Sequence, residues 1–101
     1  MTYRVIWTEY ASSRLSSIYY FAALSSETFA EKILDDIDTK VQQLTEFPNS
    51  GAKEESLKAF TEEYRYLVSG YCKVIYRTEN ASIVIVNVFD TRQDPSKMQL
   101  G

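Results

Sequence analysis

The 101-residue sequence contains no histidine and only one cysteine, Cys72. The absence of histidine removes the side chain most often used as a general base or a metal ligand near neutral pH. A single cysteine excludes an internal disulfide and any zinc site built from several cysteines. We expect Cys72 to be a small buried residue on a strand. The sequence therefore predicts neither a metal site nor a cofactor.

The sequence also lacks a long apolar run and an excess of positive charge. No segment approaches the roughly 20 apolar residues needed to cross a bilayer, and the first residues do not have the pattern of a signal peptide. These features predict a cytoplasmic protein. Eleven basic and 14 acidic residues give a formal net charge of −3, whereas nucleic-acid-binding proteins usually carry a basic excess. The charge balance therefore weighs against a nucleic-acid ligand, unless the cations gather in a local patch.

What is present is the composition of an ordinary globular protein, with 45% hydrophobic and 25% charged residues. A chain of this length forms one domain around one core, so we expect a single domain over residues 1–101. The sequence is rich in tyrosine, with eight of these residues. Tyrosine has an apolar ring and a polar tip, which suits half-buried surfaces and interfaces.

The first half of the chain has the pattern of a strand followed by two amphipathic helices. Residues 3–7 are β-branched and aromatic, as in a strand, and Thr8 can cap the helix that follows. Ser25 and Ser26 separate the two helices, which should form an antiparallel hairpin. Apolar residues recur at helical spacing in both: Ala11, Leu15, Ile18 and Ala22, then Phe29, Ile33, Ile37, Val41 and Leu44. We expect the second set to be buried against Val5, Trp7, Val74 and the last strand.

The second half predicts three strands, at about residues 64–68, 72–77 and 82–89. Residues 79–81 would form the last turn, and residues 57–60 one helical turn. Residues 83–88 are apolar almost without alternation, which is typical of a central strand covered on both faces. The predicted fold is α+β with the order β-α-α-β-β-β, in which a mainly antiparallel sheet packs one face on the helical hairpin. The other face would remain available for partners.

The turn between the predicted strands at residues 64–68 and 72–77 decides which of their side chains share a face of the sheet. A two-residue loop at residues 69–70 would mix charged and apolar side chains on both faces. A three-residue loop at residues 69–71 separates them and is the predicted register. The side chains on the helix side would be those of Tyr66, Val68, Cys72, Val74 and Tyr76. The side chains on the far side would be those of Arg65, Leu67, Lys73, Ile75 and Arg77.

This register predicts a basic face. Arg65, Lys73 and Arg77 would lie together on the far side of the sheet, and Arg92 follows the last strand. Such a face suits an acidic ligand, a phosphate or the carboxylate-rich tail of a protein partner. The alternative interpretation is a solvated face whose cations pair with nearby acids.

Several short motifs stand in order along nearly the whole chain: Tyr3-x-Val5, Thr8, Ala11 and Leu15, Pro48-x-x-Gly51, Tyr64-Arg-Tyr-Leu67, Tyr76-Arg77 and Val86-x-Val88-x-Asp-x-Arg92. Together they resemble the RelE/ParE superfamily, the toxins of type II toxin–antitoxin (plasmid-stabilisation) systems. The resemblance implies the same α+β fold. It also implies a cognate antitoxin, whose C-terminal segment wraps the toxin and masks its active face.

The superfamily has two branches with different targets. The RelE branch cleaves messenger RNA in the ribosomal A site, and the resemblance makes Lys73 and Arg92 the candidate catalytic residues. Asp90, however, stands where many relatives carry histidine or a basic residue, and no tyrosine or histidine follows in residues 91–101. These departures favour the ParE branch, which poisons DNA gyrase without a catalytic group. A RelE-like ribonuclease and a non-toxic protein-binding module of the same fold are the alternatives.

Three consecutive aromatic residues in the first helix are the candidate antitoxin-binding residues, Tyr19, Tyr20 and Phe21. At helical spacing they cannot all face one core, so at least one should lie on the surface. The alternative interpretation is a wide core stripe with a single exposed ring. A homodimer and a toxin–antitoxin hetero-oligomer are both compatible with this assignment.

Overall fold

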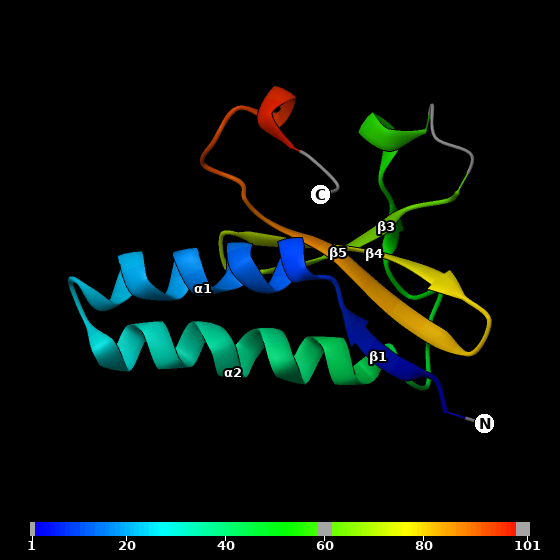
Figure 1. The fold of residues 1–101 in the computed structure, drawn as a ribbon, viewed down its shortest axis with the longest axis horizontal. Helices are drawn as coiled ribbons and strands as arrows, with labels where there is room; N and C mark the ends of the chain where they lie inside the picture. Colours follow the sequence, from blue (N-terminus) through cyan, green and yellow to red (C-terminus); the bar gives the residue numbers. More distant parts are fainter. Residues whose placement is uncertain (1, 59–61, 99–101) are drawn as a thin grey trace.

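The computed structural model describes residues 2–58 and 62–98. They form a five-stranded sheet with the strand order β1-β5-β4-β3-β2, in which β1 runs parallel to β5 and the other pairs are antiparallel. A hairpin of two helices covers one face (Figure 1). The elements in chain order are β1 (Arg4–Trp7), α1 (Glu9–Ala23), α2 (Glu27–Gln43), β2 (Ala52–Lys53), the 3-10 helix η1 (Glu55–Leu57), β3 (Arg65–Ser69), β4 (Cys72–Glu79), β5 (Ser82–Asp90) and the 3-10 helix η2 (Pro95–Lys97).

The predicted α+β fold and the order of its α-helices and strands are confirmed, with one additional strand. The two-residue strand β2 pairs with β3 at the edge of the sheet and gave no signal in the sequence. The turn predicted at residues 79–81 is present, with Asn80 at a φ of 55°. The helical turn predicted at residues 57–60 is observed earlier, as η1, and residues 59 and 60 lie outside the described part. Within that part, no helix combines the length and apolar character required to traverse a bilayer.

Both helices begin where a side chain caps them. Thr8 Oγ1 accepts a hydrogen bond from Ala11 N at 3.1 Å, and Ser26 Oγ accepts one from Phe29 N at the same distance. Each bond satisfies a backbone N–H that has no partner within the first helical turn. These local signals made the starts of α1 and α2 readable from the sequence.

Four of the five apolar residues predicted to bury α2 are in the core: Ile33, Ile37, Val41 and Leu44. They pack in one cluster with Val74, Ile83 and Ile85 of the sheet. The fifth residue, Phe29, was predicted wrongly, because 47% of its surface is exposed. It lies in the first turn of α2, at the end of the hairpin, where it lines a depression together with residues of the β3–β4 turn.

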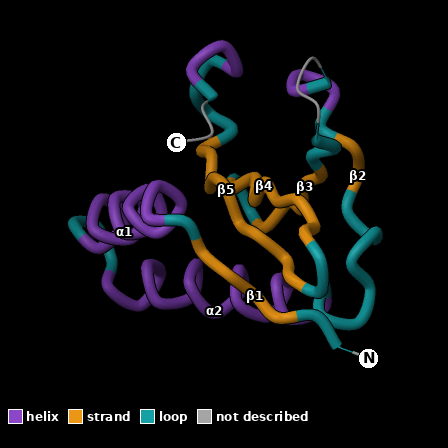
Figure 2. The backbone as a smooth tube through the Cα atoms, turned by 45° about the vertical axis from the view of Figure 1, so that its right-hand side comes forward, coloured by secondary structure: helices purple, strands orange, loops and turns teal. Residues whose placement is uncertain are grey.

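The second face of the sheet is covered. The sequence had suggested that this face would remain available for partners. A smaller apolar cluster lies there, built from Leu57, Tyr64, Ile75, Val84 and Val86, with Tyr66 and Met98 packed against it. In Figures 1 and 2, η1 and η2 stand on this side of the sheet, opposite the helices. Strand β5 is therefore covered on both faces, which confirms its assignment as a central strand and explains its continuous apolar sequence.

The predicted register of the β3–β4 hairpin was wrong. Ser69 pairs with Cys72, so that Gly70 and Tyr71 form a two-residue turn, and Gly70 has the positive φ of 59° that this turn requires. The pairing places Arg65 and Leu67 on the helix side and Tyr66 and Val68 on the far side. The prediction had reversed all four residues.

Candidate functional site

The predicted basic face is divided between the two sides of the sheet. Arg65 lies on the helix side, where its guanidinium closes the loop after α2. Its Nη1 donates to Gly51 O at 2.7 Å and to Asn49 O at 3.2 Å, and its Nη2 lies 3.1 Å from Glu63 Oε2. With three partners fixed in this way, Arg65 acts as a clamp on the loop.

The same loop is also held by Tyr76. Its hydroxyl accepts a hydrogen bond from Gly51 N at 3.0 Å and donates one to Pro48 O at 2.8 Å. A Cβ atom at position 51 would lie only 2.6 Å from the Tyr76 hydroxyl and 2.8 Å from Tyr66 O. Glycine is therefore required at this position by close packing. The Pro48-x-x-Gly51 and Tyr76-Arg77 motifs meet at this clamp.

Lys73 lies on the far face, in an ion pair that is largely buried. Its Nζ is 2.6 Å from Glu54 Oε1, and only 21% of the lysine side chain and 5% of the glutamate side chain are exposed. The ammonium also lies 4.2 Å from the centre of the Tyr66 ring. Burial acts to raise the pKa of Glu54, but hydrogen bonds with Lys73 and Ser56 and the charge of Lys73 hold it below its usual value. Lys73 therefore joins η1 to the sheet.

Arg77 is also on the far face, and its Nη1 lies 3.3 Å from Glu79 Oε2. Arg65 and Arg77 approach one depression on the surface. They line it together with Glu62, Glu63, Tyr76 and Thr78, and its volume is about 260 Å³. The two glutamates counter the positive charge of this depression.

Arg92 is the most exposed of the four cations, with 56% of its side chain accessible. Its Nε and Nη2 donate to both carboxylate oxygens of Asp90, at 2.9 and 2.7 Å. The guanidinium lies 3.9 Å from the centre of the Tyr71 ring. The hydrogen bond from Arg92 is the main cause that lowers the pKa of Asp90. Asp90 and Tyr71 thus hold a flat cation in a fixed orientation on the surface.

In the described residues, each of the four predicted cations has a carboxylate as its ion-pair partner. Burial raises the pKa of the Cys72 thiol to about 11, so this buried cysteine is an inert packing residue, as predicted. The described residues contain no group of three histidine, cysteine, aspartate or glutamate side chains that could hold a metal ion. The arrangement presents cations that can bind an anionic surface.

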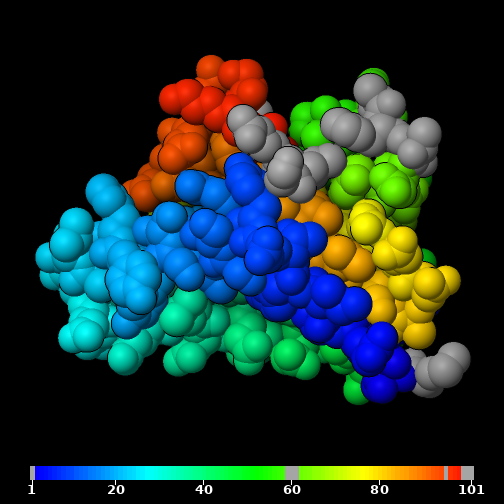
Figure 3. All heavy atoms as spheres, in the orientation of Figure 1, coloured from blue at the N-terminus to red at the C-terminus, as the bar shows by residue number. Residues whose placement is uncertain are grey.

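The candidate antitoxin-binding residues lie in the last turns of α1. In Figure 3, the end of the hairpin, coloured light blue to cyan, forms the left side of the molecule. Tyr20 and Phe21 are 69% and 68% exposed. Tyr19 is half-buried against the core and meets Tyr20 edge to face at 5.3 Å between ring centres. The sequence had missed two neighbours. Leu24 is 83% exposed and could have been found as an apolar residue off the stripe of α1, and Phe29 had been assigned to the core.

Two depressions adjoin these apolar side chains. One, of about 280 Å³, lies between α1 and the end of β5 and is lined by Arg14, Ser17, Ile18, Phe21, Asp90 and Gln93. The other, of about 200 Å³, lies between α2 and the β3–β4 turn, with Phe29, Ile33, Tyr71 and Cys72 among its lining. The end of the hairpin thus presents apolar side chains beside hollows that could receive side chains of a partner.

Comparison with known proteins gives a family match over most of the chain. The family described as "ParE toxin of type II toxin-antitoxin system, parDE" matches residues 5–95. Among solved structures, a chain of the "Chromosomal ParDE TA system from P. aeruginosa" is similar, with a TM-score of 0.68 and 24% sequence identity. The similarity covers 86% of this chain and 94% of that one, and it supports the fold. No curated protein matches the sequence.

Proposed function

The chain belongs to the ParE family of toxins of type II toxin–antitoxin systems, and we propose that it inhibits growth by poisoning DNA gyrase until a cognate antitoxin neutralises it. Its target would place this action in the cytoplasm. The observation that carries the proposal is the pairing of the two candidate catalytic residues. Lys73 is bound to the buried Glu54, and Arg92 is bound to Asp90.

These pairs argue against the alternative of RNA cleavage. Cleavage by attack of a ribose 2′-OH needs a base to take its proton and an acid to protonate the leaving oxygen. The chain has no histidine, and the Asp90 carboxylate would repel a scissile phosphate placed beside Arg92. A toxin that acts by binding needs only an ordered surface, and the exposed guanidinium of Arg92, held on Tyr71 and Asp90, provides one.

The proposal predicts that Arg92→Glu will abolish growth arrest while the protein still folds. We expect the loss because an arginine at the centre of an interface often contributes a tenfold or larger part of the affinity. Folding should be preserved because the side chain is on the surface. The measurement is growth after controlled expression, scored together with gyrase-linked DNA breaks and A-site mRNA cleavage. Lys97→Glu makes the same charge change at another exposed position and is the matched control.

The outcomes separate the three functions. DNA breaks that require gyrase, lost in Arg92→Glu and kept in Lys97→Glu, would support the proposal. Cleavage of mRNA in the A site by the parent protein would instead identify a ribonuclease. If the parent causes no arrest at all, the protein is a binding module of this fold.

For the antitoxin, we propose that an apolar segment covers the end of the hairpin around Tyr20, Phe21 and Leu24. Phe21→Ser should weaken its binding by about tenfold, because a large aromatic ring would lose its buried contact. Phe47→Ser is the matched control: Phe47 is equally exposed, at 62%, but follows the other end of α2. Titrating the labelled antitoxin with each variant measures the two affinities. Equal affinity of the two variants would contradict this location.

A further inference from the structure

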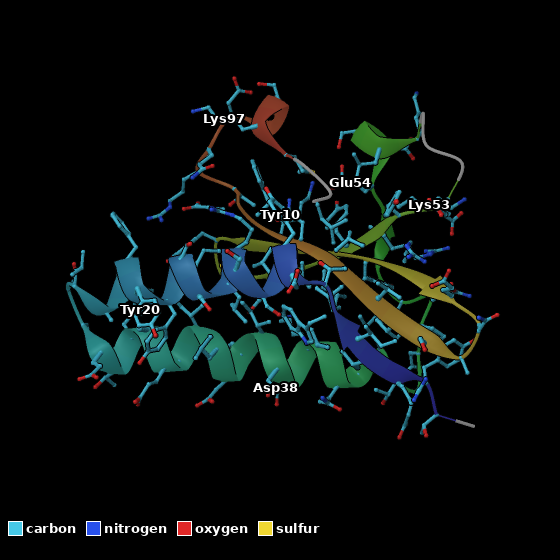
Figure 4. All side chains as sticks on the ribbon, in the orientation of Figure 1. Tyr10, Tyr20, Asp38, Lys53, Glu54 and Lys97 are labelled. Carbon is cyan, nitrogen blue, oxygen red and sulfur yellow. The ribbon has the colours of Figure 1, made fainter. Side chains whose placement is uncertain are left out.

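The depression of about 280 Å³ between α1 and the end of β5 is separate from the groove between the two helices. Asp90 and Gln93 line one wall, and the other wall is one face of α1, with Arg14, Ser17, Ile18 and Phe21 at helical spacing. Figure 4 shows Tyr20 between α1 and α2, and Lys97 beyond β5, on a different side of α1. We call this depression the Arg14 hollow.

Arg14 is a half-buried cation without an ion-pair partner in residues 2–58 and 62–98. The hydrogen bond from Arg92 is the main cause that lowers the pKa of Asp90, and the charge of Arg14 adds to the effect. Arg92 already binds both carboxylate oxygens of Asp90, so Asp90 is not free to pair with Arg14. The other lysines and arginines that lack an ion-pair partner in the described residues are exposed: Arg4, Lys40, Lys58 and Lys97.

The charge around the hollow favours an anionic ligand. A cation that is partly withdrawn from water attracts an anion more strongly than an exposed one, because less water screens its charge. Its guanidinium can bind a carboxylate through two parallel hydrogen bonds. Arg92 lies against Asp90 and adds a second positive charge, so Arg14, Asp90 and Arg92 together are positive in a chain whose net charge is −3.

The lining of the hollow also favours an apolar group beside that anion. Ile18 is almost completely buried and Phe21 is mostly exposed, so Ile18 can form the floor and Phe21 an open wall. A nucleic acid would use the cation but not the apolar floor, and the net negative charge of the chain opposes its binding. The hollow therefore fits a protein segment in which an acidic residue stands next to an apolar one.

We propose that the Arg14 hollow receives an acidic residue and its apolar neighbour from the protein target of the toxin. The carboxylate binds the guanidinium of Arg14, and the apolar side chain packs on Ile18 and against Phe21. Arg92 binds a second anionic group of the same target surface. The inference rests on the proposed function for the identity of the target, DNA gyrase, and it assigns the chemistry that the target presents.

Synthetic peptides test this chemistry without the target. Two labelled peptides carry the same leucine and phenylalanine residues, and the residues between these are glutamate in one peptide and lysine in the other. We expect the purified protein to bind the glutamate peptide with shifts of the backbone amide resonances of Ser17 and Gln93, and with an affinity that falls as salt rises. Equal binding of the lysine peptide would overturn the proposal. Tighter binding of a DNA duplex, with shifts of the same resonances, would also overturn it and make the ligand a nucleic acid.

Two pairs of variants locate the site. Arg14→Gln should weaken the glutamate peptide about fivefold, because it removes the charge that faces the carboxylate. Its matched control is Arg4→Gln, which removes an exposed arginine of β1. Ser17→Phe should weaken the peptide by filling the hollow, whereas Ser12→Phe adds the same ring on another face of α1. Thermal unfolding confirms that each variant is folded, and Phe21 is left unchanged because it also belongs to the surface proposed for the antitoxin. Unchanged affinity in both Arg14→Gln and Ser17→Phe would overturn the proposed location.

The target provides the second arm of the test. The labelled toxin is titrated with purified gyrase, and gyrase-linked DNA breaks are scored with the same preparations. We expect Arg14→Gln and Ser17→Phe to bind gyrase about fivefold more weakly or worse, and Arg4→Gln and Ser12→Phe to match the parent. If the parent and the two hollow variants bind gyrase equally well, the inference is wrong and the proposed function stands. If the parent neither binds gyrase nor causes breaks, the proposed function is wrong, and the peptides decide what the hollow binds.

Discussion

Replacing Lys73 by methionine is expected to lower the free energy of unfolding by about 3 kcal/mol at neutral pH, because it leaves a buried carboxylate unpaired. The carboxylate is that of Glu54, whose Oε1 lies 2.6 Å from Lys73 Nζ and whose side chain is 5% exposed. Methionine keeps an apolar chain beside the Tyr66 ring, so the change removes the charge with little loss of packing. Urea unfolding of the purified variant and parent measures the difference.

The deficit should shrink on acidification. In the parent protein the pKa of Glu54 is below its ordinary value of 4.5. Such a group stabilises the fold above its ordinary pKa, and that contribution is lost as the pH falls through the lowered value. Without Lys73, burial dominates and raises the pKa of Glu54, so the variant loses stability as the pH rises. A deficit of the same size at pH 7 and at about pH 4 would show that packing, not charge, is responsible.

Two further variants complete this test. Adding Glu54→Gln to Lys73→Met removes both charges and should recover much of the stability, because no buried charge is left without a partner. Lys32→Ala breaks the exposed Lys32–Asp36 pair and should cost less than about 0.5 kcal/mol. A large loss in Lys32→Ala would mean that burial does not distinguish the two pairs. The result also bears on function, since a charge reversal at Lys73 would change folding and target binding together.

Replacing Tyr76 by phenylalanine is expected to cost about 2 kcal/mol, because one hydroxyl serves two backbone groups of the loop after α2. That hydroxyl accepts from Gly51 N and donates to Pro48 O. Without the hydroxyl, the N–H of Gly51 and the carbonyl of Pro48 lose this hydrogen-bond partner in a largely buried part of the protein. Thermal unfolding measures the loss. Tyr20→Phe removes a hydroxyl from an exposed residue and should leave stability unchanged.

The loop has a second clamp, and the two should act together. Arg65 binds Gly51 O and Asn49 O, so a loop released by Tyr76→Phe would depend on Arg65 alone. Combining Tyr76→Phe with Arg65→Ala should therefore destabilise the protein by more than the sum of the single changes. Strict additivity, or a parent-like stability of Tyr76→Phe, would show that the hydroxyl does not hold the loop.

The sequence by itself determined the elements and their order, because these depend on near neighbours in the chain. The apolar period of α2 gave Ile33, Ile37 and Val41 their buried positions, and Thr8 and Ser26 marked the helix starts. The nearly continuous apolar sequence of residues 83–88 made β5 recognisable as a central strand. The motifs from Tyr3 to Arg92 were enough to indicate the superfamily, and the family match confirms it.

The tertiary structure alone decided which side of the sheet each cation occupies. A shift of one residue in the β3–β4 turn reverses every side chain of β3, and the sequence around Gly70 allows turns of two or three residues. The predicted register assumed that only one face of the hairpin is buried. Both faces are buried, because Leu57 and Met98 cover the second one from distant parts of the chain, so separating charged from apolar residues could not identify the register. Arg65 consequently became a loop clamp.

The same limit applies to the candidate sites. The sequence named Lys73 and Arg92 as cations, but only the folded chain brings Glu54 to Lys73 and lays Arg92 on Tyr71. The helical spacing of α2 gives the face on which Leu34 lies, yet the place of Leu34 beside Leu15, Tyr19 and Tyr20 depends on how α1 packs against α2. Local periodicity fixes which face of a helix a residue occupies. Contacts between segments far apart in the chain decide what that face meets.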